Sequence, residues 1–241
     1  MRTTSSTGPR DSEILLADGT RLALRIRRHG AARRMTLRLA PADGAAVLVL
    51  PPGVSERAAL AFARDRADWL ASRVAALPPS VPFTENAILP LLGTDRRLVA
   101  AAPGQRGIQF DNETISIPGR PEHFARRVRD WLRRTARHEI ESRAHPMAAR
   151  LGKSIAAIRL GDAKTRWGSC SAKGALRFSW RLVLSPPAIL TYVVAHEVAH
   201  LAQMNHSPAF WRLVETLAPD TRLPARAWLK RNGAALLRYG R

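Results

Sequence analysis

The segment at residues 189–202 constrains the possible folds of this chain more than any other part of the sequence. It is apolar on nearly every side, which predicts a helix buried in the middle of its domain. Three polar residues interrupt it, namely His196, Glu197 and His200. Residues four positions apart lie about one turn apart on the same face of a helix, so both imidazoles point to one spot, with Glu197 beside them. The fold must therefore give two imidazoles and a carboxylate a partner.

The spacing of these three residues is the HExxH arrangement of zinc hydrolases. Two imidazoles and a carboxylate buried without partners would cost several kcal/mol, and a divalent metal ion fits their spacing. A hydrogen-bonded pair of core histidines is the alternative interpretation. We expect one zinc ion per chain, with His196 and His200 among its ligands.

A catalytic zinc site needs a third protein ligand and an open position for water. Two residues are candidates: His206, six residues after His200, and Glu215, on the helix expected to follow. Ser207 and Pro208 can cap and begin that helix, so a bend just before them would bring His206 back to the metal. Glu215 would instead complete a set of two histidines and one glutamate. We favour His206.

The chain is expected to have three segments. Residues 1–12 are polar and predict a disordered lead. Residues 13–119 contain short alternating stretches separated by turns, which predict a β-rich region with one helix. Residues 120–241 have longer helical periodicities and predict a zincin-like helical core that carries the HExxH residues. The expected fold class is α+β, with an antiparallel β-rich N-terminal region packed on the C-terminal core.

Several local patterns refine this prediction. Residues 13–51 predict four short strands in an antiparallel meander, and a capped helix is expected over residues 55–77. A long helix should begin near Pro121, and Pro146 should kink or end it. Residues 164–184 predict a β-hairpin with one buried face, because apolar and polar side chains alternate along its second half.

Four motifs carry a resemblance to a known family. They are Thr165-Arg166-Trp167-Gly168-Ser169-Cys170-Ser171, Phe178-Ser179-Trp180-Arg181-Leu182, Tyr192-Val193-Val194-Ala195-His196-Glu197-Val198-Ala199-His200-Leu201 and Asn205-His206-Ser207-Pro208-Ala209-Phe210-Trp211. Together they resemble the YgjP-like metal-dependent hydrolases, which are relatives of the SprT-like and WLM zinc peptidases. The resemblance implies one family domain over about residues 25–235. It also implies that His196, His200 and His206 are metal ligands and that Glu197 is the base.

The expected activity is that of a zinc-dependent metallopeptidase acting on a peptide or protein. Zinc lowers the pKa of its bound water toward about 7, and Glu197 can take the proton during attack on a carbonyl. The developing oxyanion needs a further donor, for which Arg166, Arg181 and Tyr192 are candidates by proximity. A strand at residues 176–182 can offer an edge to an extended peptide.

The charge of the chain bears on its partners. The formal net charge is +20, and nearly all the basic residues are arginine. Codon bias and weak, non-specific nucleic-acid binding both account for this balance. The alternative function is therefore a basic nucleic-acid-associated module with a structural metal site.

Two further features bear on the environment of the protein. Cys170 is the only cysteine, which excludes an internal disulfide and indicates a reducing compartment. No uninterrupted apolar stretch approaches the roughly 20 residues that span a bilayer. We expect a cytoplasmic monomer that does not insert into membranes.

Overall fold

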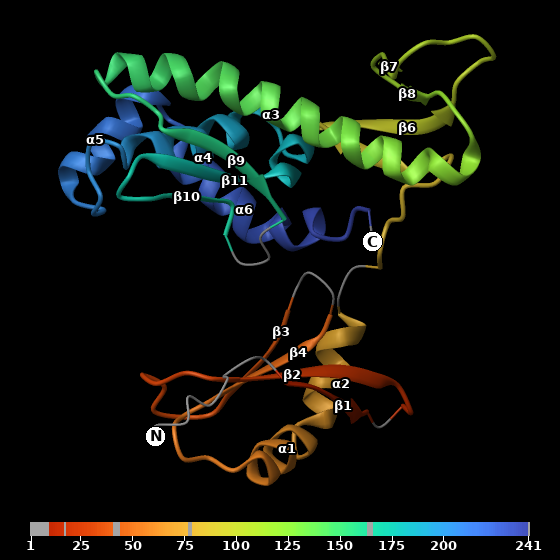
Figure 1. Cartoon of the computed structure of the whole chain (residues 1–241), viewed down its shortest axis with the longest axis vertical. Helices are drawn as coiled ribbons and strands as arrows, with labels where there is room; N and C mark the ends of the chain where they lie inside the picture. Colours follow the sequence, from red (N-terminus) through yellow and green to blue (C-terminus); the bar gives the residue numbers. More distant parts are fainter. Residues whose placement is uncertain (1–9, 17, 41–43, 77–78, 163–165, 241) are drawn as a thin grey trace, which may run out of the picture. The chain divides into compact units, whose positions relative to one another are not determined.

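The computed structural model describes residues 10–16, 18–40, 44–76, 79–162 and 166–240. The chain forms two compact units, Met1–Pro79 and Ser80–Arg241, which are drawn in Figure 1. The division after Pro79 differs from the expected boundary near Gly119. The cause is that the strands between these two positions share a hydrophobic core with the C-terminal helices.

The N-terminal unit contains a four-stranded sheet and two helices. Its elements are β1 (Arg10–Leu15), β2 (Arg21–Arg28), β3 (Thr36–Leu39), β4 (Ala46–Leu50), α1 (Glu56–Arg64) and α2 (Ala67–Ala75). The strand order is β1-β2-β4-β3, with β2 and β4 parallel and the other pairs antiparallel. The predicted antiparallel meander is therefore wrong. The apolar strand β4 is buried along most of its length and takes a central position, whereas β3 is only half-buried and lies at the edge.

Two smaller expectations for this unit also change. The strand β1 begins at Arg10, inside the expected disordered lead, and residues 1–9 of that lead lie outside the described residues. The single helix expected after residue 55 is two helices, because the backbone of Arg66 leaves the helical region at φ −114° and ψ 19°. The predicted cap is confirmed, since the side chain of Ser55 accepts a hydrogen bond from the Ala58 N–H.

The C-terminal unit begins with a second four-stranded sheet. Its strands are β5 (Ile88–Leu91), β6 (Thr94–Ala100), β7 (Gln109–Phe110) and β8 (Thr114–Ile117), in the order β5-β6-β8-β7. These strands were expected from the sequence, but β6 and β8 are parallel. The turn between β7 and β8 is stabilised by Asp111, whose carboxylate accepts hydrogen bonds from the N–H groups of Glu113 and Thr114.

A short 3₁₀ helix, η1 (Pro121–His123), leads into the long helix α3 (Phe124–Arg150). The apolar face of α3 covers the second sheet through Val128 and Leu132, and its C-terminal half joins the core around α4. Pro146 does not end the helix, which continues to Arg150 and is drawn as one unbroken ribbon in Figure 1. Proline inside a helix removes one backbone hydrogen bond, and the packed residues on both sides of Pro146 hold the helix together.

A third sheet lies under α4 and consists of β9 (Ala157–Gly161), β10 (Gly168–Cys170) and β11 (Ala175–Ser179), in the order β10-β11-β9. The predicted hairpin is confirmed by the antiparallel pairing of β10 with β11. Its second strand ends early, because residues Trp180–Leu184 form the 3₁₀ helix η2. Since β11 pairs with β9 on its other side, it offers no free edge, and the strand at the edge beside α4 is β10.

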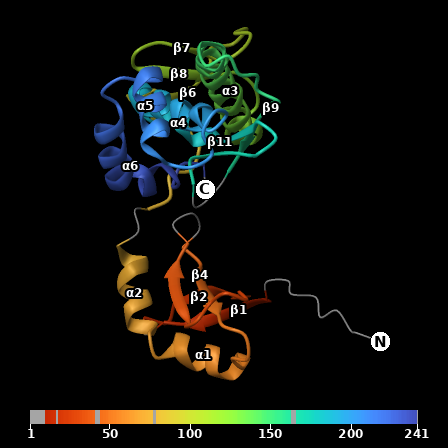
Figure 2. The same cartoon turned by 90° about the vertical axis from the view of Figure 1, so that its left-hand side faces the viewer.

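The remaining helices are α4 (Pro187–Ala199), α5 (Pro208–Leu217) and α6 (Arg222–Leu236). The helix α4 is buried along most of its length, as its apolar sequence predicts. Figure 1 and Figure 2 both show α4 between α3 and α6, in the middle of the C-terminal unit. No helix in the described part of the chain is long and apolar enough to cross a membrane.

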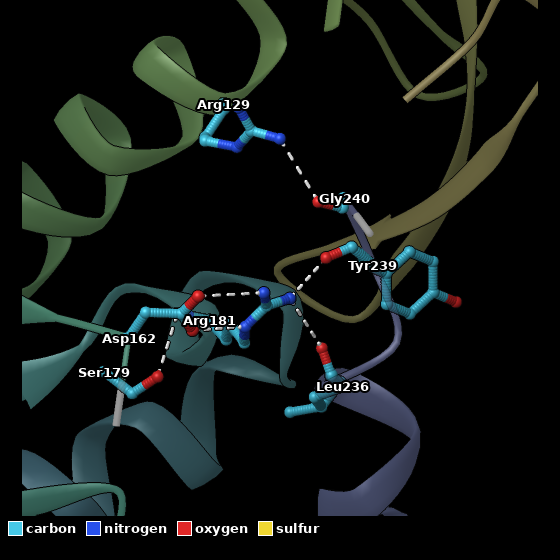
Figure 3. A network of polar contacts seen from close by, with 7 residues as sticks. All are labelled: Arg129, Asp162, Ser179, Arg181, Leu236, Tyr239 and Gly240. Atoms are coloured by element: carbon cyan, nitrogen blue, oxygen red, sulfur yellow. Dashed lines mark hydrogen bonds and ion pairs between the residues drawn. The ribbon is translucent and has the colours of Figure 1, made fainter. Parts of the chain in front are cut away.

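A buried arginine ties the end of α6 to this core, as Figure 3 shows. Arg181, in η2, is 2% exposed, and its guanidinium binds both carboxylate oxygens of Asp162 at 2.7 and 3.2 Å. The same guanidinium donates to the backbone carbonyls of Leu236 and Tyr239. The Leu236 carbonyl lies at the C-terminal end of α6, where a helix leaves its acceptors without intrahelical donors, and Tyr239 lies three residues beyond it. Arg181 therefore fixes the position of α6.

Candidate active site

The helix α4 and the turn after it bring three histidines together. His196 lies in the last turn of α4, His200 is the residue at which the helix ends, and His206 lies in the turn that leads to α5. Each offers a ring nitrogen, and the three nitrogens lie within 4.8 Å of one another. The Nε2 atoms of His196 and His206 are 3.1 Å apart. The turn is closed by Ser207, whose side chain caps α5 as the sequence predicts.

Neighbouring groups fix the orientation of these rings. The Nδ1 atom of His200 lies 2.9 Å from the carbonyl oxygen of Gln203, and a carbonyl can only accept. His200 therefore carries its proton on Nδ1 and keeps a lone pair on Nε2. The ring of His206 stacks on Trp211 at 5.5 Å between centroids, and Phe210 packs against His200 at 4.5 Å. These contacts fix the rings and leave ring nitrogens available to bind a metal ion.

The charges at the site favour neutral imidazoles. Burial, together with the charges of His200, His206 and Arg226, lowers the pKa of His196 to about 4. Burial likewise lowers the pKa of His200. The Nδ1 atom of His196 is buried, and no described residue gives it a hydrogen-bond partner. Near neutral pH His196 and His200 are therefore neutral, which is the state in which imidazole binds metal ions.

The donor set fits a divalent metal ion. A tetrahedral zinc site with Zn–N bonds of about 2.0–2.1 Å separates its ligand nitrogens by about 3.4 Å. The separation of 3.1 Å between the His196 and His206 nitrogens is close to this value. Among the described residues, no fourth His, Cys, Asp or Glu joins the group. Three histidine ligands would leave a coordination position for water or substrate.

Glu197 lies beside the histidines with its side chain in a cavity of about 320 Å³. The residues that line this cavity are Arg166, Trp167, Gly168, Tyr192, Val193, His196, Glu197, Arg226 and Leu229. Glu197 is only 6% exposed. Burial raises the pKa of its carboxyl group to about 7, and the charge of Arg166 acts in the opposite direction. The cavity therefore joins one of the three histidines to a buried carboxylate that can exchange a proton near neutral pH.

The backbone of β10 comes unusually close to Glu197. A Cβ atom added at Gly168 would lie 2.5 Å from both Cγ and Oε1 of Glu197, which is closer than such atoms approach. Glycine at this position thus lets the carboxylate lie against the edge strand. The Trp-Gly-Ser motif contained this residue, but nothing in the sequence indicated that its hydrogen atom faces Glu197.

Of the other residues that the sequence suggested for the site, some lie at the cavity and others do not. Glu215 is exposed and lies outside the group of histidines, and its carboxylate accepts a hydrogen bond from the N–H of Asp220 at 2.8 Å. Arg166 and Tyr192 line the cavity, as a role at the site requires. Arg181 does not line it, because its guanidinium is taken up by the network at the end of α6. Arg226 was missed, since it lies far along the chain from the other residues.

Three histidines grouped beside a buried carboxylate, in a mixed α+β fold, fit the class of metal-dependent hydrolases. The family described as YgjP-like, metallopeptidase domain, matches residues 33–232. The chain belongs to this family and is a metal-dependent peptidase by its membership.

One solved structure is similar to part of the chain. It is the crystal structure of the metallopeptidase zymogen of Pyrococcus abyssi abylysin, with 26% sequence identity and a TM-score of 0.35. The similarity covers 42% of this chain and 97% of that chain. A search of curated proteins found no match.

Proposed function

We propose that the protein is a zinc-dependent metallopeptidase in which His196, His200 and His206 hold the ion. The proposal rests on one observation, the grouping of three histidine nitrogens within 4.8 Å beside the cavity that contains Glu197. When bound, zinc supplies a Lewis acid that makes water acidic near neutral pH and polarises a carbonyl. Imidazole ligands also suit copper, iron and nickel, so the identity of the metal needs a measurement.

Glu197 acts as the general base. Its carboxylate accepts a proton from the attacking water and returns the proton to the nitrogen of the leaving amine. Tyr192 and Arg166 line the same cavity and are the candidate donors to the oxyanion. Burial raises the pKa of Tyr192, so its hydroxyl keeps its proton near neutral pH and can donate a hydrogen bond. The edge strand β10, which begins at Gly168 against Glu197, is the strand along which an extended peptide can pair.

Elemental analysis of protein purified without added metal tests the first part of the proposal. We expect about one zinc ion per chain. A content below about 0.2 zinc, or other divalent metal, per chain would contradict the proposed site. A full content of another divalent metal would keep the site and overturn the assignment of zinc.

Replacement of Glu197 tests the chemistry. Glu197→Gln keeps all three histidines, so zinc content should hold, while hydrolysis of an unfolded protein such as casein should fall by about 10²–10⁴. Glu215→Gln makes the same change on an exposed glutamate away from the histidines and should leave hydrolysis unchanged. If the wild type cleaves casein and zinc-loaded Glu197→Gln cleaves it equally fast, Glu197 is not the base.

A further inference from the structure

We propose that the cavity beside Glu197 contains a carboxylate-binding subsite formed by Arg226 and Arg166, which makes the enzyme prefer peptides carrying a carboxylate near the bond that is cleaved. The cleavage preference rests on the proposed function, whereas binding of the carboxylate does not. The carboxylate can belong to an Asp or Glu side chain or to the C-terminus of the peptide, since the two present the same chemistry.

The two arginines reach the cavity from separate elements. Arg226 is in the first part of α6, and Arg166 lies just before β10. Both line the cavity together with His196 and Glu197. The charge of Arg226 contributes to the lowered pKa of His196 and opposes the effect of burial on the pKa of Tyr192, and the charge of Arg166 opposes the effect of burial on the pKa of Glu197. Two cations therefore lie within electrostatic range of the groups proposed to act in hydrolysis.

The cavity carries an excess of positive charge. Glu197 is the single acidic residue among those that line it. Neither Arg166 nor Arg226 has an ion pair with any described residue. Two other arginines of this unit have partners: Asp162 binds Arg181, and the centre of the Trp211 ring lies 3.6 Å from the guanidinium carbon of Arg222. An arginine that is held at a cavity without an acidic partner is suited to bind the carboxylate of a ligand.

The walls of the cavity strengthen such a contact. Trp167, Val193 and Leu229 supply apolar surface to the same cavity. Apolar surroundings lower the local dielectric response, so an arginine–carboxylate pair is stronger here than on an open surface. A volume of about 320 Å³ lies in the range of pockets that hold small ligands, and leaves room for a short stretch of peptide. A lysine side chain at the same place would be repelled.

Arg226 is the better residue to replace. It is exposed and makes no hydrogen bond to a described residue, so its replacement should not affect folding. Arg166 acts on the charge of Glu197, and its loss would change the base together with the subsite. Arg231 lies on the same helix, is also exposed and does not line the cavity. Arg231→Glu is therefore the matched control for Arg226→Glu.

The experiment uses dye-labelled alanine-glycine heptapeptides that carry Asp, Asn or Lys at each position in turn, each with a free or an amidated C-terminus. Binding to the zinc-loaded full chain is measured by fluorescence anisotropy, and cleavage by mass spectrometry. We expect at least one position at which Asp binds about tenfold more tightly than Asn, or a free C-terminus more tightly than its amide. Arg226→Glu should abolish this preference and favour Lys, while Arg231→Glu should keep it.

The outcomes separate the subsite from the peptidase function. Equal binding and equal cleavage of charged and neutral peptides would overturn the subsite and leave the function standing. Selective binding of acidic peptides that are never cleaved by zinc-loaded protein would support the subsite and contradict the function. An equal loss of preference in Arg226→Glu and Arg231→Glu would mean that the preference for a carboxylate depends only on the net charge of the protein, and would overturn the subsite.

Discussion

His206 is the member of the histidine group that lies in the turn leading to α5, beyond the end of α4, and it is exposed. We expect His206→Ala to lower zinc affinity by orders of magnitude, because two remaining imidazoles hold the ion poorly. Glu215→Ala should leave the affinity nearly unchanged, since its carboxylate binds the N–H of Asp220. Competition with a colorimetric chelator measures both variants. Tight binding in His206→Ala together with loss in Glu215→Ala would reverse the ligand assignment.

Gly168 gives a second prediction at the scale of single residues. The methyl group of Gly168→Ala would collide with Glu197, so the carboxylate must move away from the backbone of β10. A displacement of about 1 Å at a reacting group can cost about 10²-fold in rate. We expect casein hydrolysis to fall by at least about tenfold while zinc content stays constant.

Gly161→Ala is the matched control for this variant. Gly161 lies in β9 of the same sheet, and its added Cβ would meet only the Arg177 side chain, at 3.9 Å. This variant should keep its hydrolytic rate. Equal rates in Gly168→Ala and the wild type would mean that the position of Glu197 does not depend on Gly168.

The residues that could be predicted at the site are those whose spacing is local. His196, Glu197 and His200 follow from helical geometry, and His206 follows from a short turn that Ser207 can cap. Arg226 could not be predicted, because α6 reaches the cavity only through tertiary packing. The same limit explains Arg181, which was a site candidate by proximity although its guanidinium is buried elsewhere.

At the scale of elements, Arg181 should act on stability rather than on catalysis. Arg181→Ala removes a buried charge that binds Asp162 and the donor to the carbonyls of Leu236, the last residue of α6, and of Tyr239 beyond it. Loss of such a buried network should lower the free energy of unfolding by about 2–3 kcal/mol. Urea unfolding measures this change. Arg177→Ala, which removes an exposed arginine from the adjacent strand β11, should change stability by less than about 0.5 kcal/mol.

A low rate of hydrolysis in Arg181→Ala with unchanged stability would contradict this assignment and return Arg181 to the candidate oxyanion donors. The comparison should be made below the unfolding transition of the variant, so that loss of folded protein is not mistaken for loss of chemistry.

The elements themselves were easier to predict than their pairing. The alternation of apolar and polar side chains predicted the positions of most strands, but it does not predict which strands pair with each other. Both four-stranded sheets contain a parallel pair that was not expected. The packing around α3 outweighed the effect of Pro146 on the helix. In each case a tertiary contact decided what a local pattern left open.

At the scale of the whole molecule, the two units have separate hydrophobic cores. The core of the first unit is made by residues between Ile14 and Leu70. The two clusters of the second unit draw on residues from Phe83 onward, and all the site residues belong to this unit. The boundary was predicted at Gly119 because a Gly-Pro stretch resembles a linker. The packing of the second sheet on α3 could not be predicted from that local pattern.

This separation predicts that residues 80–241 fold and bind metal without the rest of the chain. We expect the fragment to contain about one zinc ion and to match the full chain in zinc affinity. Metal that binds only the folded state raises its stability, so chelation should lower the unfolding temperature of both proteins. His196→Ala in the fragment should abolish this effect of the chelator. Since the family match begins at residue 33, a fragment that fails to fold would show that residues 33–79 are needed for the metal-binding unit.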